Sequence, residues 1–163
     1  CLVGLHLFCI YLLEGNVTHL FELRGKHVSK DLIEKVYQQF NGCTWFVQMM
    51  MNELFALTKH DELCDIDKLE PAEQNVIMTQ ESSYKDLLAH LAPKQKLILQ
   101  AIAREGTAKN VTSAAFIKRY NLPSASSVQS AIKGLLKNDI ITQEEDGYRI
   151  YDYFFATWLA KDY

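Results

Sequence analysis

Along most of this 163-residue chain, apolar side chains recur every three or four positions, the spacing that gathers them on one face of a helix. In the C-terminal part the pattern predicts three helices, over Pro93 to Arg104, Ser113 to Tyr120 and Ser124 to Lys137. Pro93 suits a first helical turn, Gly106 can end that helix, and Thr112 and Ser124 can cap the two that follow. The side chains expected on the buried faces are Leu97, Ile98, Ala101 and Ile102, then Phe116, Ile117 and Tyr120, then Val128, Ala131, Ile132, Leu135 and Leu136.

A different pattern follows the third helix. Ile140 to Gln143 and Tyr148 to Tyr151 alternate in polarity on either side of Asp146-Gly147, a strong hairpin signal. Asp152 can cap a closing helix that carries Phe154, Phe155, Trp158 and Leu159. The turn at Asn121 to Pro123 makes the third helix a recognition helix, and the hairpin then forms its wing. This order of elements predicts a winged helix-turn-helix over residues 93–163.

The first 92 residues predict a bundle of helices. Val17 to Leu23 predicts a short helix, preceded by a break at Glu14-Gly15-Asn16. Ser29 can cap a helix that ends at Asn41-Gly42, and a further helix opens at Thr44. This last helix is apolar on more than half of its circumference and is expected at the centre of the bundle. Its apolar side chains are Trp45, Phe46, Met49, Met50, Leu54 and Leu57.

Lys59 to Glu70 is acidic and irregular, and it lacks the turn glycine of a calcium loop, so a solvated linker is expected. A long helix begins at Pro71, with an interruption near Ser82-Ser83 left open. The predicted fold is therefore mainly α, with a helical bundle over residues 1–70, a connecting helix over 71–92 and a winged helix over 93–163. Residues 1–16 are the least defined part of the bundle.

Residues 1–13 are apolar and uncharged, and the sequence does not begin with Met. The stretch is too short to span a bilayer and has no basic flank, although a signal-peptide remnant remains open. We expect a core helix that truncation of a longer chain has exposed, and we expect no membrane association.

Charge differs between the two parts of the chain. Residues 1–92 hold 7 Lys and Arg against 13 Asp and Glu, whereas residues 93–163 hold 10 against 7. Only the second part favours a polyanion, and only mildly. Cys1, Cys9, Cys43 and Cys64 lack the spacing of a zinc site or a disulfide scaffold, which indicates a cytoplasmic protein with buried thiols at Cys9 and Cys43. The five histidines are scattered, so no metal site is expected.

The sequence contains no phosphate loop of the form GxxxxGK[ST], no GxSxG and no HExxH motif. No catalytic residue is therefore assigned, and the chain is not expected to be an enzyme on its own.

Two stretches nevertheless resemble a known family. Lys26 to Ser29, Phe40 to Gln48 (FNGCTWFVQ) and Met51 to Leu54 are similar to the helical lid of bacterial and archaeal P-loop ATPases of the AAA+/STAND type. Leu91 to Lys96, Leu99 to Ala103, Leu122 to Ala131 and Asp152 to Leu159 are similar to the winged helix that closes the same proteins. The likeness covers roughly residues 17–163.

The resemblance implies that this chain is the C-terminal part of an ATPase whose core, with its ATP and Mg²⁺, precedes the lid. It places Gly42 and Thr44 near the nucleotide, at the lid's Gly-x-Pro turn, with Thr44 in place of the proline. Since the phosphate loop is absent here, the chain itself is expected to hold no cofactor.

The resulting function hypothesis is a module that couples the nucleotide state of an upstream ATPase core to binding by the winged helix. If the ligand is DNA, the third helix enters the major groove. The side chains expected near phosphates or base edges are Ser124, Ser126, Ser127, Gln129, Ser130, Lys133 and Arg149. The acidic wing tip, Glu144-Glu145-Asp146, favours protein docking instead. A stand-alone winged-helix module for protein interaction or transcriptional regulation, without ATPase function, is the alternative.

Overall fold

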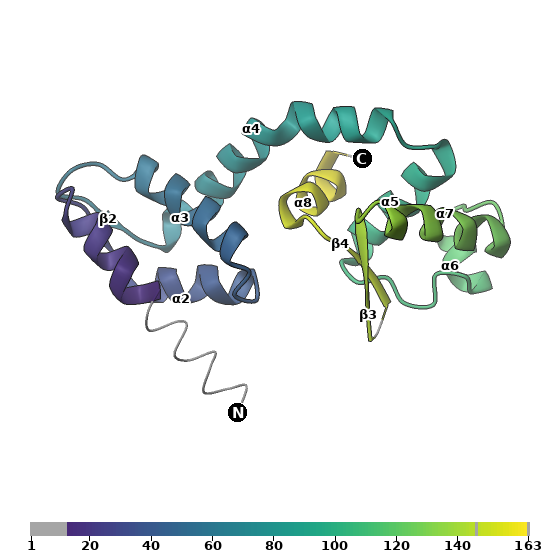
Figure 1. Cartoon of the computed structure of the whole chain (residues 1–163), viewed down its shortest axis with the longest axis horizontal. Helices are drawn as coiled ribbons and strands as arrows, with labels where there is room; N and C mark the ends of the chain where they lie inside the picture. The colour runs from purple at the N-terminus through teal and green to yellow at the C-terminus, as the bar shows by residue number, and fades with distance from the viewer. Residues whose placement is uncertain (1–12, 146, 163) are drawn as a thin grey trace. The chain divides into compact units, whose positions relative to one another are not determined.

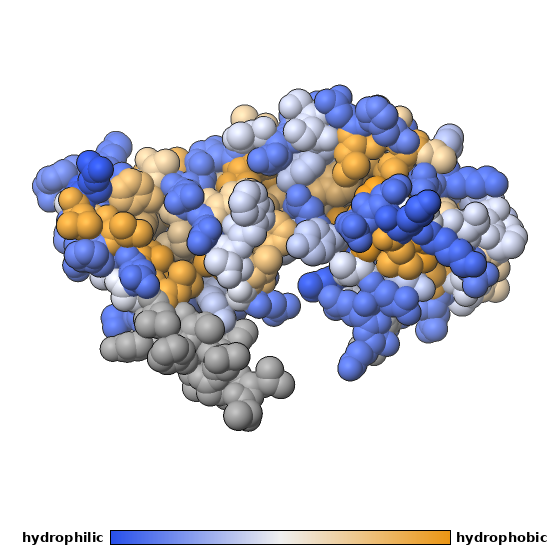
Figure 2. All heavy atoms as spheres, viewed as in Figure 1, coloured by the Kyte–Doolittle hydropathy of each residue, from blue (hydrophilic) through white to orange (hydrophobic). Residues whose placement is uncertain are grey.

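The computed structural model describes residues 13–145 and 147–162. The chain forms two compact units, one ending at Thr79 and the other beginning at Gln80 (Figure 1). The long helix α4 (Leu69–Ala89) contributes residues to both units. Each unit has a buried core of its own, and apolar side chains also reach the surface of each (Figure 2).

Within the described residues, three α-helices precede α4 in the N-terminal unit. Residues 13–22 form the first of them, followed by α2 (Lys30–Gln39) and α3 (Thr44–Leu57). The Ser29 hydroxyl caps α2 by accepting a hydrogen bond from the Leu32 N–H at 3.3 Å, as the sequence predicts. Asn41 and Gly42 end α2 in left-handed conformations, with φ of 49° and 69°. The buried side chains of the two labelled helices are Leu32, Ile33, Val36, Tyr37, Phe46, Val47, Met50, Met51 and Leu54.

A short parallel pair of strands ties this unit together. β1 (His27–Val28) lies beside β2 (Leu63–Cys64), and a 3₁₀ turn, η1 (Ile66–Lys68), follows β2. Lys59 to Glu70 is mostly exposed, as the sequence predicts, but the prediction that it is an irregular linker is wrong. The Cys64 side chain is fully buried as a free thiol, and burial raises its pKa. The two strands are joined by backbone hydrogen bonds, which do not require a periodic pattern of side chains. The sequence pattern therefore gave no sign of this pair.

Other expectations for the N-terminal unit need correction. Helix runs through Glu14-Gly15-Asn16, where a break was predicted, and nothing crowds the Gly15 position. Trp45, in the first turn of α3, is 67% exposed rather than central, because the buried face of this helix consists of Phe46, Val47, Met50, Met51 and Leu54. Cys43 is only partly buried. The predictions for residues 1–12, including the buried thiol at Cys9, lie outside the described residues.

The C-terminal unit has the order of elements that the sequence predicts. Helices α5 (Pro93–Glu105), α6 (Ala114–Arg119) and α7 (Ala125–Lys137) precede the hairpin of β3 (Ile141–Glu144) and β4 (Gly147–Ile150), and α8 (Tyr153–Asp162) follows. The strands are antiparallel, with Thr142 opposite Arg149. The predicted fold class, mainly helical with a small hairpin near the C-terminus, is confirmed.

Helix α5 is central to the core of this unit, because α7 and α8 both pack against it. Aromatic rings close the core on the side of α8. Tyr84 of α4 lies with its ring centroid 5.1 Å from that of Phe155 and 5.6 Å from that of Trp158. The Asp152 carboxylate caps α8 by accepting from the Phe155 N–H at 3.0 Å, while burial raises the pKa of this carboxyl.

Three details in the C-terminal unit differ from expectation or were left open. The cap of α6 is Ser113 and not Thr112, since the Ser113 hydroxyl accepts from the Phe116 N–H at 3.2 Å. Leu97 is 42% exposed, because α5 directs only Ile98, Leu99, Ala101 and Ile102 into the core. Helix α4 passes through Ser82-Ser83 without interruption. Among the described residues, none of the helices combines the length and apolar character needed to cross a bilayer.

Candidate nucleic-acid interface

The turn between α6 and α7 sets where the recognition helix begins. Asn121 leaves α6 with a φ of 50°, Leu122 is buried, and Pro123 cannot extend the helix. Ser124 then takes an extended conformation, and its hydroxyl accepts a hydrogen bond from the Ser127 N–H at 3.2 Å. The hydroxyl of Ser124 is thus already engaged as the helix cap.

The buried face of α7 packs closely on α5. Val128, Ala131, Ile132 and Leu135 are buried, and the Gly134 position allows the close approach. A Cβ at Gly134 would lie 2.6 Å from Nε2 of Gln95, whose side chain is itself held by the Ala92 N–H at 3.0 Å. The recognition helix is therefore fixed to α5, and its opposite face has a defined orientation.

The exposed face of α7 gathers the residues predicted from the sequence. Ser126, Gln129, Ser130 and Lys133 are exposed, and Ser127 is half-buried. The Ser126 hydroxyl lies 3.2 Å from that of Ser124. Six of the seven predicted side chains thus lie on α7 or at its cap, on one continuous surface that carries hydroxyl, amide and ammonium groups.

Sequence reasoning missed a further cation at this surface. Lys94, in the first turn of α5, places its Nζ 3.5 Å from the Ser127 hydroxyl. Together with Gln95, Ser126 and Ser130 it lines a polar groove of about 520 Å³ beside the start of α7. Since Lys94 comes from another helix, the periodicity of α7 gives no sign of it.

The wing places the seventh predicted residue in a different setting. Arg149 lies on β4, and its Nε forms an ion pair with the Glu144 carboxylate at 2.6 Å. Glu145 is exposed beside it, and Asp146 lies outside the described residues. The guanidinium of Arg149 is therefore partly neutralised before any phosphate approaches.

A third segment braces the wing. Ala108 and Tyr148 exchange two backbone hydrogen bonds, at 2.8 and 3.0 Å. A Cβ at Gly147 would lie 2.3 Å from the Ala108 carbonyl oxygen, so glycine alone fits this position without a backbone shift. The hairpin is thus anchored to the loop between α5 and α6.

Side-chain hydrogen bonds also tie α5 to the helix-turn-helix. The Glu105 carboxylate, at the end of α5, accepts from the Arg119 guanidinium at 2.9 Å and from the Tyr120 hydroxyl. These two hydrogen bonds lower the pKa of Glu105. The ionised carboxylate therefore joins the end of α5 to the end of α6.

The two residues predicted near a nucleotide lie in the N-terminal unit, between α2 and α3. Gly42 packs against Tyr37, since a Cβ there would lie 2.7 Å from the phenol oxygen. Thr44 is the exposed first residue of α3, and Cys43 precedes it as a cap with no side-chain hydrogen bond. Among the residues described, no group of three His, Cys, Asp or Glu side chains is placed to hold a metal ion.

Residues 82–161 match a family model described as a probable winged helix domain. This part of the chain is a winged helix domain. The match covers just under half of the chain and begins upstream of Pro93, in α4, where Tyr84 joins the core of the winged helix domain. No curated protein and no solved structure matches the chain. The resemblance of the preceding residues to an ATPase lid stays a prediction.

Proposed function

We propose that the winged helix domain binds duplex DNA through the exposed face of α7. What supports this most is that Ser126, Gln129, Ser130 and Lys133 share one surface of a helix whose other face is fixed to α5. An α-helix fits the major groove, where an amide such as that of Gln129 can read a base edge and lysines can neutralise phosphates. Lys94 adds a cation at the rim of the same surface.

The side chains would contribute in different ways. Lys133→Ala should weaken binding to all DNA sequences. It should also reduce the slope of log affinity against log salt concentration by about 0.9 in magnitude, the value for one lost phosphate contact. Gln129→Ala should relax preference at one base pair. Lys161→Ala is the control for charge, because Lys161 is exposed on α8 at the other end of the domain sequence. Fluorescence anisotropy with mixed duplex DNA at several salt concentrations measures each effect.

The wing offers the sharpest test. Glu144→Gln removes one negative charge and also releases the Arg149 guanidinium, whereas Glu145→Gln removes one charge only. If the wing lies along a DNA backbone, both variants should bind DNA more tightly. Only Glu144→Gln should also show a steeper dependence of affinity on salt, by the amount expected for about one additional phosphate contact. No binding by the unmodified chain or by either variant at low salt would refute the DNA proposal.

Protein docking is the second candidate, and the Glu144–Arg149 ion pair favours it. A wing whose only arginine is held by a carboxylate, with Glu145 beside it, presents little positive charge to a polyanion. A partner surface rich in lysine and arginine suits this wing better than a phosphate backbone does. Absence of DNA binding in the anisotropy experiment would favour this function.

We further propose that the N-terminal unit acts as the lid of a P-loop ATPase core, as its resemblance implies. The left-handed turn at Gly42 and the exposed Thr44 at the start of α3 support this, because they lie at the turn that the resemblance places near the nucleotide. In that arrangement ATP and Mg²⁺ belong to the core and not to this chain. An in-frame phosphate loop upstream of Cys1 in the genomic DNA would support the proposal, and a non-coding upstream sequence would contradict it.

Calorimetry tests the same proposal on the chain itself. Titration with Mg-ATP should give no tight binding, because the described residues offer neither a phosphate cradle nor a cluster of acids for Mg²⁺. A micromolar dissociation constant would overturn the assignment of nucleotide binding to a separate core.

A further inference from the structure

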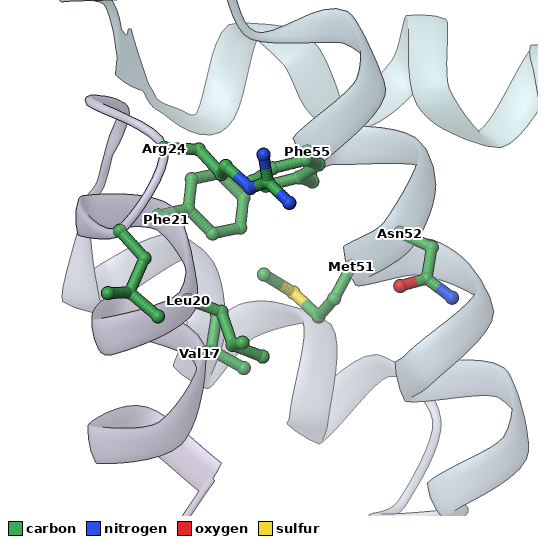
Figure 3. Close-up of a pocket in the computed structure, with 8 residues that line it drawn as sticks. Val17, Leu20, Phe21, Arg24, Met51, Asn52 and Phe55 are labelled. Atoms are coloured by element: carbon green, nitrogen blue, oxygen red, sulfur yellow. The ribbon is translucent and has the colours of Figure 1, made fainter.

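An open apolar groove lies on the N-terminal unit, between the helix of residues 13–22 and α3 (Figure 3). It has a volume of about 340 Å³, near the lower end of the range of about 300–1,000 Å³ typical of ligand pockets. The side chains that matter for its chemistry are Val17, Leu20, Phe21, Arg24, Met51 and Phe55.

The floor of the groove is firmly packed, while its rim is apolar and exposed. Phe21 is 2% exposed and meets Phe55 edge to face, with ring centroids 5.0 Å apart. Leu20, on the helix of residues 13–22, and Leu23, in the turn that follows it, are 59% and 64% exposed. Two neighbouring leucines left in water beside a formed groove are typical of a binding surface.

Charge around the groove is one-sided. Among the described residues that line it, Arg24 is the one with a charge, and Figure 3 shows this side chain reaching towards Phe55. Glu22 instead lines a separate hollow of the first helix, and the Glu53 carboxylate accepts a hydrogen bond from Asn75 at 2.9 Å. Lys26 lies over the Phe55 ring at 3.8 Å from the centroid and donates to the Phe55 carbonyl. In a unit where residues 1–79 hold 11 acidic and 6 basic side chains, the groove is thus bordered by positive charge from Arg24 and Lys26.

The surface continues along α3 without charge. Trp45, Gln48 and Asn52 are exposed and lie three and four residues apart, so they follow one another along one side of the helix. Asn52 also lines the groove. Protein interfaces are enriched in aromatic residues and depleted of charge in their centres, which is the character of this stripe.

We propose that this groove binds an amphipathic helix of a partner protein, with a carboxylate of that helix paired to Arg24. A groove between two helices accepts apolar side chains spaced at i, i+3 or i+4 and i+7 on a third. The guanidinium at one end supplies the complementary charge and fixes the direction of the bound helix, because arginine pairs with carboxylates in bidentate fashion. This inference is independent of the DNA proposal, which concerns the winged helix domain alone.

A displayed library of amphipathic helices, with leucine-rich faces and randomised flanking positions, serves as the probe against the full chain. The helices selected should share an Asp or Glu at a fixed distance from the apolar anchors. Binding of a selected peptide should weaken about 30-fold with Arg24→Glu and also with Leu20→Ser. Leu63→Ser and Lys35→Glu are the matched controls, since Leu63 is 53% exposed and Lys35 is an exposed cation on α2.

A charge swap separates pairing from general attraction. Replacing the selected carboxylate by lysine should abolish binding to the unmodified chain and restore binding to the Arg24→Glu variant. Failure to enrich any helix, or selected helices that bind Leu20→Ser and Arg24→Glu unchanged, would overturn the proposal. So would light scattering that shows self-association lost with Leu20→Ser, because the occupant would then be a second copy of the chain.

Discussion

Trp158 holds the C-terminal helix of the winged helix domain in place, and its removal should destabilise this domain selectively. The side chain is 2% exposed and lies against Tyr84 and Phe155, with its ring stacked on Phe155 at a centroid distance of 6.1 Å. A buried aromatic side chain removes roughly 150–250 Å² from water, which at about 25 cal/mol per Å² is worth about 4–6 kcal/mol. Part of this remains in alanine, so Trp158→Ala should cost about 3–5 kcal/mol.

The loss is a large fraction of the stability of a domain of this size, which is about 5–15 kcal/mol. It should lower the melting temperature by more than about 10 °C. Hydrogen exchange detected by mass spectrometry locates the effect, because peptides from α5 and α8 should lose protection while peptides from α2 and α3 keep it. Lys161→Ala, at an exposed position of the same helix, should change nothing, and Trp158→Phe should cost less than alanine. Equal protection in Trp158→Ala and Lys161→Ala would show that the ring is not part of the core.

Three further predictions concern the frame around the recognition helix. Gly147→Ala should destabilise the wing by about 1–3 kcal/mol, because the added methyl group would contact the Ala108 carbonyl. Hydrogen exchange at the Tyr148 amide should then become faster, and an unchanged exchange rate would contradict the close approach of Gly147 to Ala108. Ser124→Ala should cost about 1 kcal/mol in urea unfolding by loss of the α7 cap, and an unchanged midpoint would contradict that role. The pKa of Glu105 is lowered in the folded chain, so its hydrogen bonds with Arg119 and Tyr120 stabilise the fold. This stabilisation is complete at pH values above the ordinary pKa of glutamate, and it is lost as the pH falls through the lowered pKa of the folded chain. In Glu105→Gln the free energy of unfolding should therefore fall less steeply as the pH is lowered. An unchanged pH dependence in the acid range would contradict this role of Glu105.

The helices and wing of the C-terminal unit could be predicted because local signals agree there. Ser124 caps α7, Asp152 caps α8, and Asp146-Gly147 joins two alternating segments. Such signals act over a few residues, so periodicity and turn chemistry reveal them. The misplaced cap, Ser113 in place of Thr112, shows the limit of this approach, since both residues have the required hydroxyl.

The features missed by the sequence depend on contacts between distant residues. The β1–β2 pair joins residues 36 positions apart, and Ala108 pairs with Tyr148 across 40. Lys94 reaches α7 from another helix, and the ion pair of Arg149 with Glu144 depends on the register of the hairpin. The hairpin pattern predicts an arginine on the wing, but only the folded backbone shows which carboxylate it meets.

The buried thiol of Cys64 can be used to measure how often the N-terminal unit opens. A thiol-specific reagent can modify this sulfur only when the packing around it opens, because the side chain is fully buried and the thiolate is disfavoured. At saturating reagent the labelling rate becomes the rate of that opening, and the reaction of the partly exposed Cys43 serves as the comparison within the same chain. Labelling kinetics at Cys64 would therefore follow the lifetime of the closed N-terminal unit without any engineered probe.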